Sequence, residues 1–426
     1  MRGGASQSQA SNARRPTRCT ARAGIALCGA LALASLPEPA QAQLGPVGSA
    51  PVDARSAALA GAVSADVSGF AAALHNPAGL VRRPGLELGL SYAYREHALR
   101  VDGSDSRVAG AHRLVAGLAA TGELFELPAG FGLSAQLPLA AAPRAASGPW
   151  WERHDPRVQV LELATSVALR PHARLELGLG AVHLIGVSDR GTARELGPGS
   201  TSRAEPSSGA RSLPQAGITL ELSPRARLGL VLRGGAELRS RLVAARAPGG
   251  GVDGRAPRGA SALAAYVPPE LIVGSSAQVS ERIRLSFDVA YLGYAALEGP
   301  FVDRAEDSLA PRAPRLQDRV SPRVGLEWLM PGFERSGLRV PIRAGYALEP
   351  SPLGDDDPSE LVVDTTRHRA SLGCAVEVPD SGLEIGVHAS FGMLPERLRI
   401  VGDPSRLLSA DGTQSDIGLS LSVRAP

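Results

Sequence analysis

The sequence predicts an all-β protein: a transmembrane antiparallel β-barrel of about fourteen strands. Three observations support this fold class. Apolar and polar side chains alternate over most of the chain after Pro84, and no later window keeps the 3.6-residue period of a long amphipathic helix. Each alternating segment is near the length that a tilted strand needs to cross a bilayer. Short links alternate with long polar ones, which is typical of an outer-membrane barrel and not of a sandwich.

The N-terminus has the order of a secretory signal peptide. Five arginines and no acid precede an apolar run over residues 23–36, and Ala40-Gln41-Ala42 follows. This order predicts cleavage after Ala42. The apolar run is too short to serve as a stop-transfer helix. The predicted organisation is a signal peptide over residues 1–42, an N-terminal plug over residues 43–84, and an outer-membrane barrel over residues 85–426.

Charge and residue usage narrow the function classes. The formal charge of +3 includes the five arginines and Glu38 of the signal, so the mature chain lies near −1 and nucleic acid is not an expected partner. The chain has no lysine, and Cys374 is the only cysteine left after cleavage. One cysteine forms neither an internal disulfide nor a cysteine-based metal site. No hydrolase elbow, zinc-protease motif or phosphate loop is present, so we expect no enzyme, no cofactor and no metal.

The strand pattern predicts which side chains face the lumen. From Leu86 to Tyr94, and again from Ile283 to Tyr291 and from Leu383 to Phe391, apolar residues alternate with small or charged ones. Successive side chains of a strand point to opposite faces, so the apolar set faces lipid and the other set faces the lumen. The lumen set contains both signs of charge, which predicts internal ion pairs. It comprises Glu87, Arg95, Glu162, Glu176, Arg233, Glu237, Arg239, Arg284, Asp288, Glu327, Arg343 and Glu384.

The links between the strands fall into two classes. Short turns are predicted at residues 171–173, 223–227, 280–281 and 379–381. Long polar loops are predicted over residues 188–213, 243–269, 295–321, 349–366 and 395–413. An even number of strands returns the C-terminus to the side of the short turns, which is the periplasmic side in such barrels.

The segment Asn76-Pro77-Ala78-Gly79 lies between the signal and the first alternating strand. Asn76 is the only asparagine of the mature chain. Proline fixes its own φ and restricts the residue before it, whereas glycine frees the backbone that follows. The segment is therefore predicted to be a shaped plug or turn rather than the interior of a helix.

Several stretches resemble the FadL-type outer-membrane transporters of long-chain fatty acids and aromatic hydrocarbons. Those similar to the N-terminal hatch of that family are Ala54-Arg55-Ser56-Ala57-Ala58-Leu59-Ala60-Gly61-Ala62, Ala65-Asp66 and His75-Asn76-Pro77-Ala78-Gly79-Leu80. Those similar to its barrel are residues 233–240, residues 268–274, and Arg343-Ala344-Gly345-Tyr346 with Ser351-Pro352. The resemblance implies a fourteen-stranded barrel whose lumen is plugged by the hatch, with Asn76 and Pro77 holding the hatch in position.

The resemblance also implies a route for the ligand. In the family, ligand is captured among extracellular loops, moves to a pocket beside the hatch and leaves through a lateral gap at a strand kink. Pro138 is the candidate for that kink because proline donates no hydrogen bond to a strand ladder; alternatively, Pro138 only ends its strand. Trp150 and Trp151 are candidates for loop capture, or alternatively for an anchor at the membrane interface.

Lumen-facing arginines are the candidate contacts for a ligand carboxylate, for which a guanidinium is well shaped. They are Arg233, Arg239, Arg284 and Arg343. The alternative is that these arginines pair with acids of the lumen, because buried charges are normally paired. The candidate acids are Glu237, Asp288 and Glu327.

The function that the resemblance implies is passive uptake of hydrophobic small molecules, such as long-chain fatty acids, across the outer membrane of a Gram-negative cell. Its partners would be a hydrophobic ligand and outer-membrane lipid, and the barrel would act as a monomer. The alternative is that the barrel and its hatch form a scaffold or accessory for the assembly or secretion of surface proteins.

Overall fold

The computed structural model describes residues 52–106, 110–139, 150–151, 159–187, 193–197, 200–205, 210–246, 259–297, 301–302, 315–355, 362–401 and 406–425. All of them belong to one compact unit that spans Ala40–Pro426. The predicted signal peptide and its cleavage site lie outside the described residues and stay predictions.

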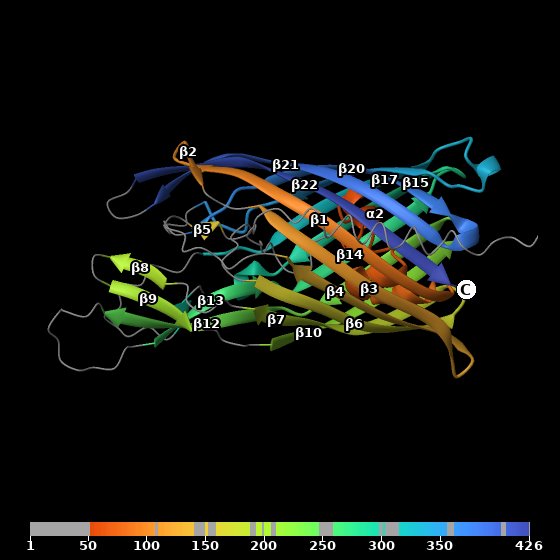
Figure 1. The fold of residues 1–426 in the computed structure, drawn as a ribbon, viewed down its shortest axis with the longest axis horizontal. Coiled ribbons are helices and arrows are strands. Elements are labelled where there is room, and N and C mark those ends of the chain that lie inside the picture. Colours follow the sequence, from red (N-terminus) through yellow and green to blue (C-terminus); the bar gives the residue numbers. More distant parts are fainter. Residues whose placement is uncertain are drawn as a thin grey trace, which may run out of the picture. The chain divides into compact units, whose positions relative to one another are not determined.

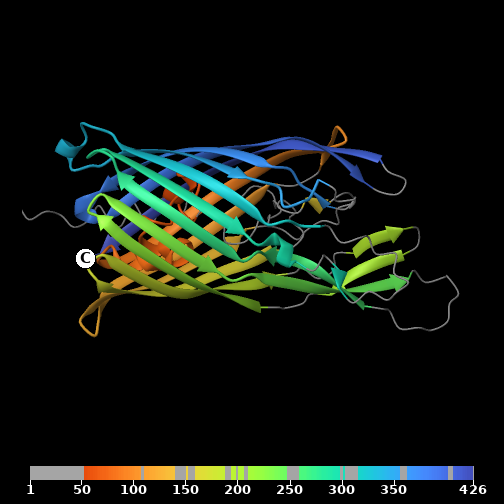
Figure 2. The same ribbon diagram turned by 180° about the vertical axis from the view of Figure 1, so that it is seen from behind.

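Fourteen strands of the described chain form a closed antiparallel barrel (Figures 1 and 2), which confirms the predicted fold class and strand number. β1 closes the ring, because it pairs with β3 on one side and with β22 on the other. A short strand, β2 (Ser104–Ser106), extends the sheet beside β1. The barrel strands are β1 (Gly85–Val101), β3 (Ala111–Leu124), β4 (Leu127–Pro138), β6 (Gln159–His172), β7 (Leu175–Val187), β10 (Ala210–Ser223), β11 (Ala226–Arg233), β14 (Glu270–Gln278), β15 (Ile283–Leu292), β17 (Arg319–Leu329), β18 (Pro341–Glu349), β20 (Arg367–Val378), β21 (Leu383–Val401) and β22 (Arg406–Ala425).

The outer face of the barrel is apolar and its inner face is polar or small. In β1, Leu86, Leu88 and Leu90 are exposed on the outside, whereas Glu87 and Ser91 are buried inside. The other barrel strands repeat this alternation, with exposed leucine, valine, isoleucine and aromatic side chains. Every barrel strand has a partner on both edges, so the sheet leaves no open edge that lipid would have to solvate.

The predicted short turns are confirmed. Turns of a few residues join β6 to β7, β10 to β11, and β14 to β15, and the 3-10 turn η5 (Pro379–Ser381) joins β20 to β21. The C-terminal end of β22 lies at the same end of the barrel, because Ala425 pairs with Leu86 at the start of β1. We call this end the short-turn end.

All five predicted long loops contain strand residues in the described part of the chain, so their prediction as loops throughout was wrong. Residues 395–413 are largely the paired ends of β21 and β22. The predicted loops over residues 188–213 and 243–269 contribute to a separate sheet in the order β16-β13-β12-β9-β8 (Figure 1). Backbone N–H and C=O groups pair in these strands whatever their side chains, so a prediction based on alternating apolar residues does not find them. The strands of this sheet are β8 (Ala193–Gly197), β9 (Ser200–Glu205), β12 (Ala236–Arg246), β13 (Gly259–Val267) and β16 (Phe301–Val302).

The smaller elements outside the barrel wall complete the described chain. β5 (Trp150–Trp151) and β19 (Val362–Val363) form a parallel pair. The 3-10 turns η3 (Tyr294–Ala296) and η4 (Glu334–Ser336) lie after β15 and between β17 and β18.

The N-terminal segment, which we call the hatch (residues 52–84), lies inside the barrel. It contains α2 (Ala54–Ala58), η1 (Gly69–Ala71), α3 (Ala72–His75) and η2 (Pro77–Val81). Asp53 caps α2 by accepting a hydrogen bond from the backbone N–H of Ser56. No helix in the described part of the chain is long and apolar enough to span a membrane.

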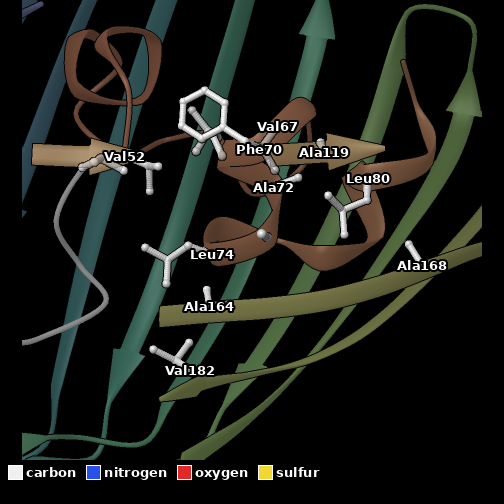
Figure 3. Close-up of a cluster of buried hydrophobic side chains, with 14 of the residues drawn as sticks. Val52, Val67, Phe70, Ala72, Leu74, Leu80, Ala119, Ala164, Ala168 and Val182 are labelled. Atoms are coloured by element: carbon white, nitrogen blue, oxygen red, sulfur yellow. The ribbon is translucent and has the colours of Figure 1, made fainter. Parts of the chain in front are cut away.

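Apolar side chains of the hatch pack against the inner wall (Figure 3). Phe70, Leu74 and Leu80 of the hatch meet wall residues such as Ala164 and Ala168 in one buried cluster. The wall residues are small where the hatch is bulky, so the two parts fill the lumen together. Burying this apolar surface is the main favourable contribution to holding the hatch in place.

Candidate functional site

Asn76 joins three parts of the structure. Its Oδ1 accepts a hydrogen bond from the backbone N–H of Ala78 (3.1 Å), which caps η2. Its Nδ2 donates to the carbonyl of Ser64 (2.6 Å) in the hatch and to Oγ1 of Thr219 (3.3 Å) on β10. Asn76 is fully buried. The amide therefore fixes the turn, the rest of the hatch and the wall relative to one another.

The wall makes room for this turn with glycine. A Cβ at Gly178 of β7 would overlap the backbone of Pro77 and Ala78, and a Cβ at Gly217 of β10 would overlap Oδ1 of Asn76. Any larger residue at either position would push the turn away from the wall. Gly79 itself lies against the carbonyl of Val67, so the predicted motif has no space for a side chain there.

A group of ion pairs joins the hatch to the wall at the short-turn end. Asp66 of the hatch accepts from Arg55 (3.0 Å), Arg227 (2.6 Å) and Arg284 (2.8 Å). Burial alone would raise the pKa of the Asp66 carboxyl, but the surrounding arginines hold that pKa below its usual value. Asp66 therefore stays ionised and holds segments far apart in the sequence together.

A second carboxylate anchors the hatch from the wall side. Asp288 of β15 accepts hydrogen bonds from the backbone N–H groups of Val63 (3.1 Å) and Ser64 (3.0 Å). The wall therefore holds residues 63–66 of the hatch through two carboxylates, Asp66 and Asp288.

Three of the four predicted lumen arginines pair with acids in the described part of the structure. Arg233 contacts Glu270 at 2.5 Å, which is an acid that the sequence did not single out. Arg284 contacts Glu327 at 3.4 Å in addition to Asp66. Arg343 contacts Glu327 (2.7 Å), Glu377 (3.4 Å) and Glu384 (3.5 Å). Arg239, like Glu237, lies on β12 of the separate sheet, so its predicted place on a strand of the barrel wall was wrong. Its side chain is outside the described part. Pairing is thus what the structure shows, and contact with a ligand stays a prediction.

Pro138 is the last residue of β4, opposite Arg113 of β3, and the register between these strands runs without a shift. It lines a cavity of about 40 Å³ beside the N-terminal part of the hatch. The same cavity is lined by Asp416 from the lumen side and by Tyr92 and His112, which hydrogen-bond to each other on the outer side. Pro138 therefore borders a cavity that residues from the inner and the outer face of the wall both line. Its role as a kink stays a prediction.

Trp150 and Trp151 form β5, which pairs with Val362–Val363 of β19. Their side chains lie outside the described part of the chain, so ligand capture and interfacial anchoring both stay predictions. Among the described residues, no group of three or more His, Cys, Asp and Glu side chains is placed to hold a metal ion.

Sequence reasoning missed two features of the site. The charge centre at Asp66 was hidden because its arginine partners are dispersed from residue 55 to residue 284, whereas pairing of the lumen arginines with Glu327 was one of the predicted alternatives. The glycines facing the hatch did leave a signal, since they stand at lumen positions of alternating strands. They include Gly178, Gly217, Gly229, Gly274 and Gly345.

Comparisons with known proteins support the fold. No family model and no curated protein matches the sequence. A FadL homologue from Pseudomonas aeruginosa has a similar structure, with a TM-score of 0.64, 14% sequence identity, and coverage of 91% of this chain and 99% of that chain.

Two toluene transporters also have similar structures. TodX of P. putida has a TM-score of 0.57 and 16% identity, and TbuX of Ralstonia pickettii has a TM-score of 0.57 and 13% identity. Each match covers 88% of this chain and 98% of the other. With the closed barrel and the hatch in its lumen, these likenesses confirm the predicted resemblance at the level of the fold: the chain has the fold of the FadL-type outer-membrane transporters.

Proposed function

We propose that this barrel passes hydrophobic small molecules across the outer membrane by passive uptake, with the hatch controlling the lumen. The observation that carries the proposal is the hatch itself: it lies in the lumen and is held there by apolar packing, hydrogen bonds and ion pairs, without a covalent link to the wall other than the chain that leads into β1. A permanently open pore has no use for such a plug. The names of the similar structures, a FadL homologue and toluene transporters, support the same class of cargo.

We also propose that cargo leaves or enters through the wall near Pro138. The strands β3 and β4 end there at Ala111 and Pro138, whereas β1 continues to Val101. The cavity at that level has lining residues from both faces of the wall. A lateral route of this kind would deliver an apolar molecule without exposing it to water.

The proposal also covers the processing, oligomeric state and membrane of the protein. Residues 1–42 would be removed on export, and the mature chain would act as a monomer in outer-membrane lipid. Long-chain fatty acids and monoaromatic hydrocarbons are the cargo classes to compare, because both are apolar enough for the proposed route.

Uptake into liposomes tests the proposal directly. Purified barrel in lipid vesicles should admit radiolabelled toluene or oleate faster than empty vesicles do. Deleting residues 50–80 should change that rate, because the lumen would then lack its plug. Equal uptake rates in vesicles with and without the barrel, for both toluene and oleate, would contradict the proposed function.

A further inference from the structure

A polar cavity of about 230 Å³ lies at the short-turn end of the lumen, between the hatch and the wall. It is separate from the cavity beside Pro138, since the two share no lining residue. Hatch and wall both contribute to it. Its lining consists of Arg55, Asp66, Ser68, Arg82, Arg83, Arg227, Arg284, Glu327, Arg339, Arg343 and Glu377.

The lining carries an excess of positive charge. Seven arginines face three acids, which leaves four positive charges in excess. Three further acids, Glu176, Glu221 and Glu384, pair with arginines of the lining, and Arg170 pairs with the first of them. Counting these four residues as well still leaves an excess of two positive charges.

The ion pairs do not use all of the guanidinium groups. Asp66 and Glu327 are each shared by three arginines, and Glu377 contacts Arg339 only at 3.8 Å. Arg83 has no ion pair or side-chain hydrogen bond among the described residues, although it lines both this cavity and a smaller neighbouring one. Donors that face a cavity with too few acceptors are the arrangement that an anion completes.

We propose that this cavity is a binding site for a small oxyanion, with Arg83 as a contact. Guanidinium groups match the planar or tetrahedral oxygens of carboxylate and phosphate, and the hydroxyl of Ser68 adds one more donor to the lining. The oxyanion is either free in solution or the acidic head of an amphiphile. The inference goes beyond uptake, because the site would bind its anion whether or not the barrel transports anything.

Titration calorimetry on the purified barrel in neutral detergent tests the site. The probes are inorganic phosphate, octanoate below its micelle concentration, and octanol as the neutral partner of octanoate, all at one ionic strength set with chloride. We expect saturable binding of one oxyanion per barrel. The variant Arg83→Gln should weaken that binding at least tenfold, and it removes no ion pair on which folding depends.

The matched control is Arg100→Gln. Arg100 is exposed at the far end of β1, where it pairs with Asp411 at 2.7 Å, and it should leave oxyanion binding unchanged. Phosphate binding that depends on Arg83 would identify a free oxyanion as ligand, and octanoate binding alone, without octanol binding, would identify an amphiphile head. Absence of binding for both anions, or wild-type affinity in Arg83→Gln, would overturn the proposal. Toluene uptake by the same preparation tests the proposed function separately.

Discussion

At the scale of single residues, Asn76 fixes the position of the turn relative to the rest of the hatch and to the wall. Its amide satisfies the carbonyl of Ser64 and the hydroxyl of Thr219, and its oxygen caps η2. Each of these groups is buried, so removing the amide would leave unpaired polar atoms away from water. The effect of a change at Asn76 on transport should therefore pass through the position of the hatch.

We expect Asn76→Ala to weaken hatch docking by about 1–3 kcal/mol, the usual cost of leaving buried hydrogen-bonding groups unpaired. Hydrogen exchange read by mass spectrometry should show faster exchange in residues 52–84 and unchanged exchange in the barrel strands. The control is Gln278→Ala, since Gln278 makes one exposed contact with the carbonyl of Glu281. Unchanged hatch exchange in Asn76→Ala would contradict the role assigned to the amide.

His75, the neighbour of Asn76, makes docking of the hatch depend on pH. The pKa of His75 is lowered to about 4; burial is the largest cause, Asp53 opposes it, and the charges of Arg233 and Arg323 add to it. Nε2 of His75 has no hydrogen-bond partner among the described residues. The docked hatch therefore holds a neutral imidazole, while a released hatch would titrate near the ordinary value of 6.5.

The sign of the pH effect follows from this difference. Above pH 6.5 the imidazole is neutral in both states, and between pH 6.5 and 4 only the released hatch takes up a proton. Docking should therefore weaken as the pH falls through this window, by about 3 kcal/mol at its lower end. We expect faster hatch exchange at pH 5 than at pH 7.5 after correction for intrinsic exchange rates. His75→Gln should abolish the difference, whereas His172→Gln, at the exposed end of β6, should keep it.

At the scale of elements, the turn η2 fits its place because strands β7 and β10 carry glycine opposite it. The close approach of Gly178 to the backbone of Pro77 and Ala78 leaves no room for a side chain. The wall strand itself has no such constraint on its outer face, so a larger residue at Gly178 should disturb the hatch and not the barrel.

We expect Gly178→Val to displace the hatch while the barrel still folds. Valine is a good strand residue, so β7 should keep its pairing. Trypsin should then cleave within residues 52–84 faster than in the wild type, and the cleaved barrel should keep its resistance to detergent at room temperature. Gly122→Val is the matched control, because a Cβ at Gly122 meets nothing within 4 Å. Equal cleavage of both variants would show that the glycine contact does not position the hatch.

Some elements of the structure could be predicted from the sequence and others could not. Strands with a lipid face, such as β1 and β15, were predicted because every second residue of such a strand faces lipid and is apolar. The sheet that contains β12 and β13 was missed, because its strands pair outside the barrel sheet and the sequence does not indicate that pairing. Asn76-Pro77 was predicted as a fixed turn from backbone restrictions alone, whereas its contact with Thr219 depends on strand register and was not predictable. The charge centre at Asp66 was missed for the same reason.

At the scale of the whole molecule, the two faces of the barrel wall have opposite polarity. Outside, side chains such as Phe287 and Leu372 are exposed and apolar, and inside, Asp66 and Arg284 form part of a charged network. The closed sheet separates them, since it satisfies its own backbone hydrogen bonds. An apolar outer face is stabilising only if lipid covers it. The loss of folding stability caused by a charged residue on that face should therefore depend on how deep in the bilayer the residue lies.

We expect Leu372→Arg to destabilise the folded barrel in lipid vesicles by about 2–4 kcal/mol, the cost of a charge near the middle of a bilayer. Leu372 is exposed midway along β20. Val279→Arg is the matched control, because Val279 is also exposed but lies in the turn between β14 and β15, where the cost should be about 0–1 kcal/mol. Equilibrium unfolding by guanidinium in phosphatidylcholine vesicles measures both. Equal destabilisation at the two positions would contradict a membrane centred on β20, whereas the expected difference would place the bilayer along the strands independently of any ligand.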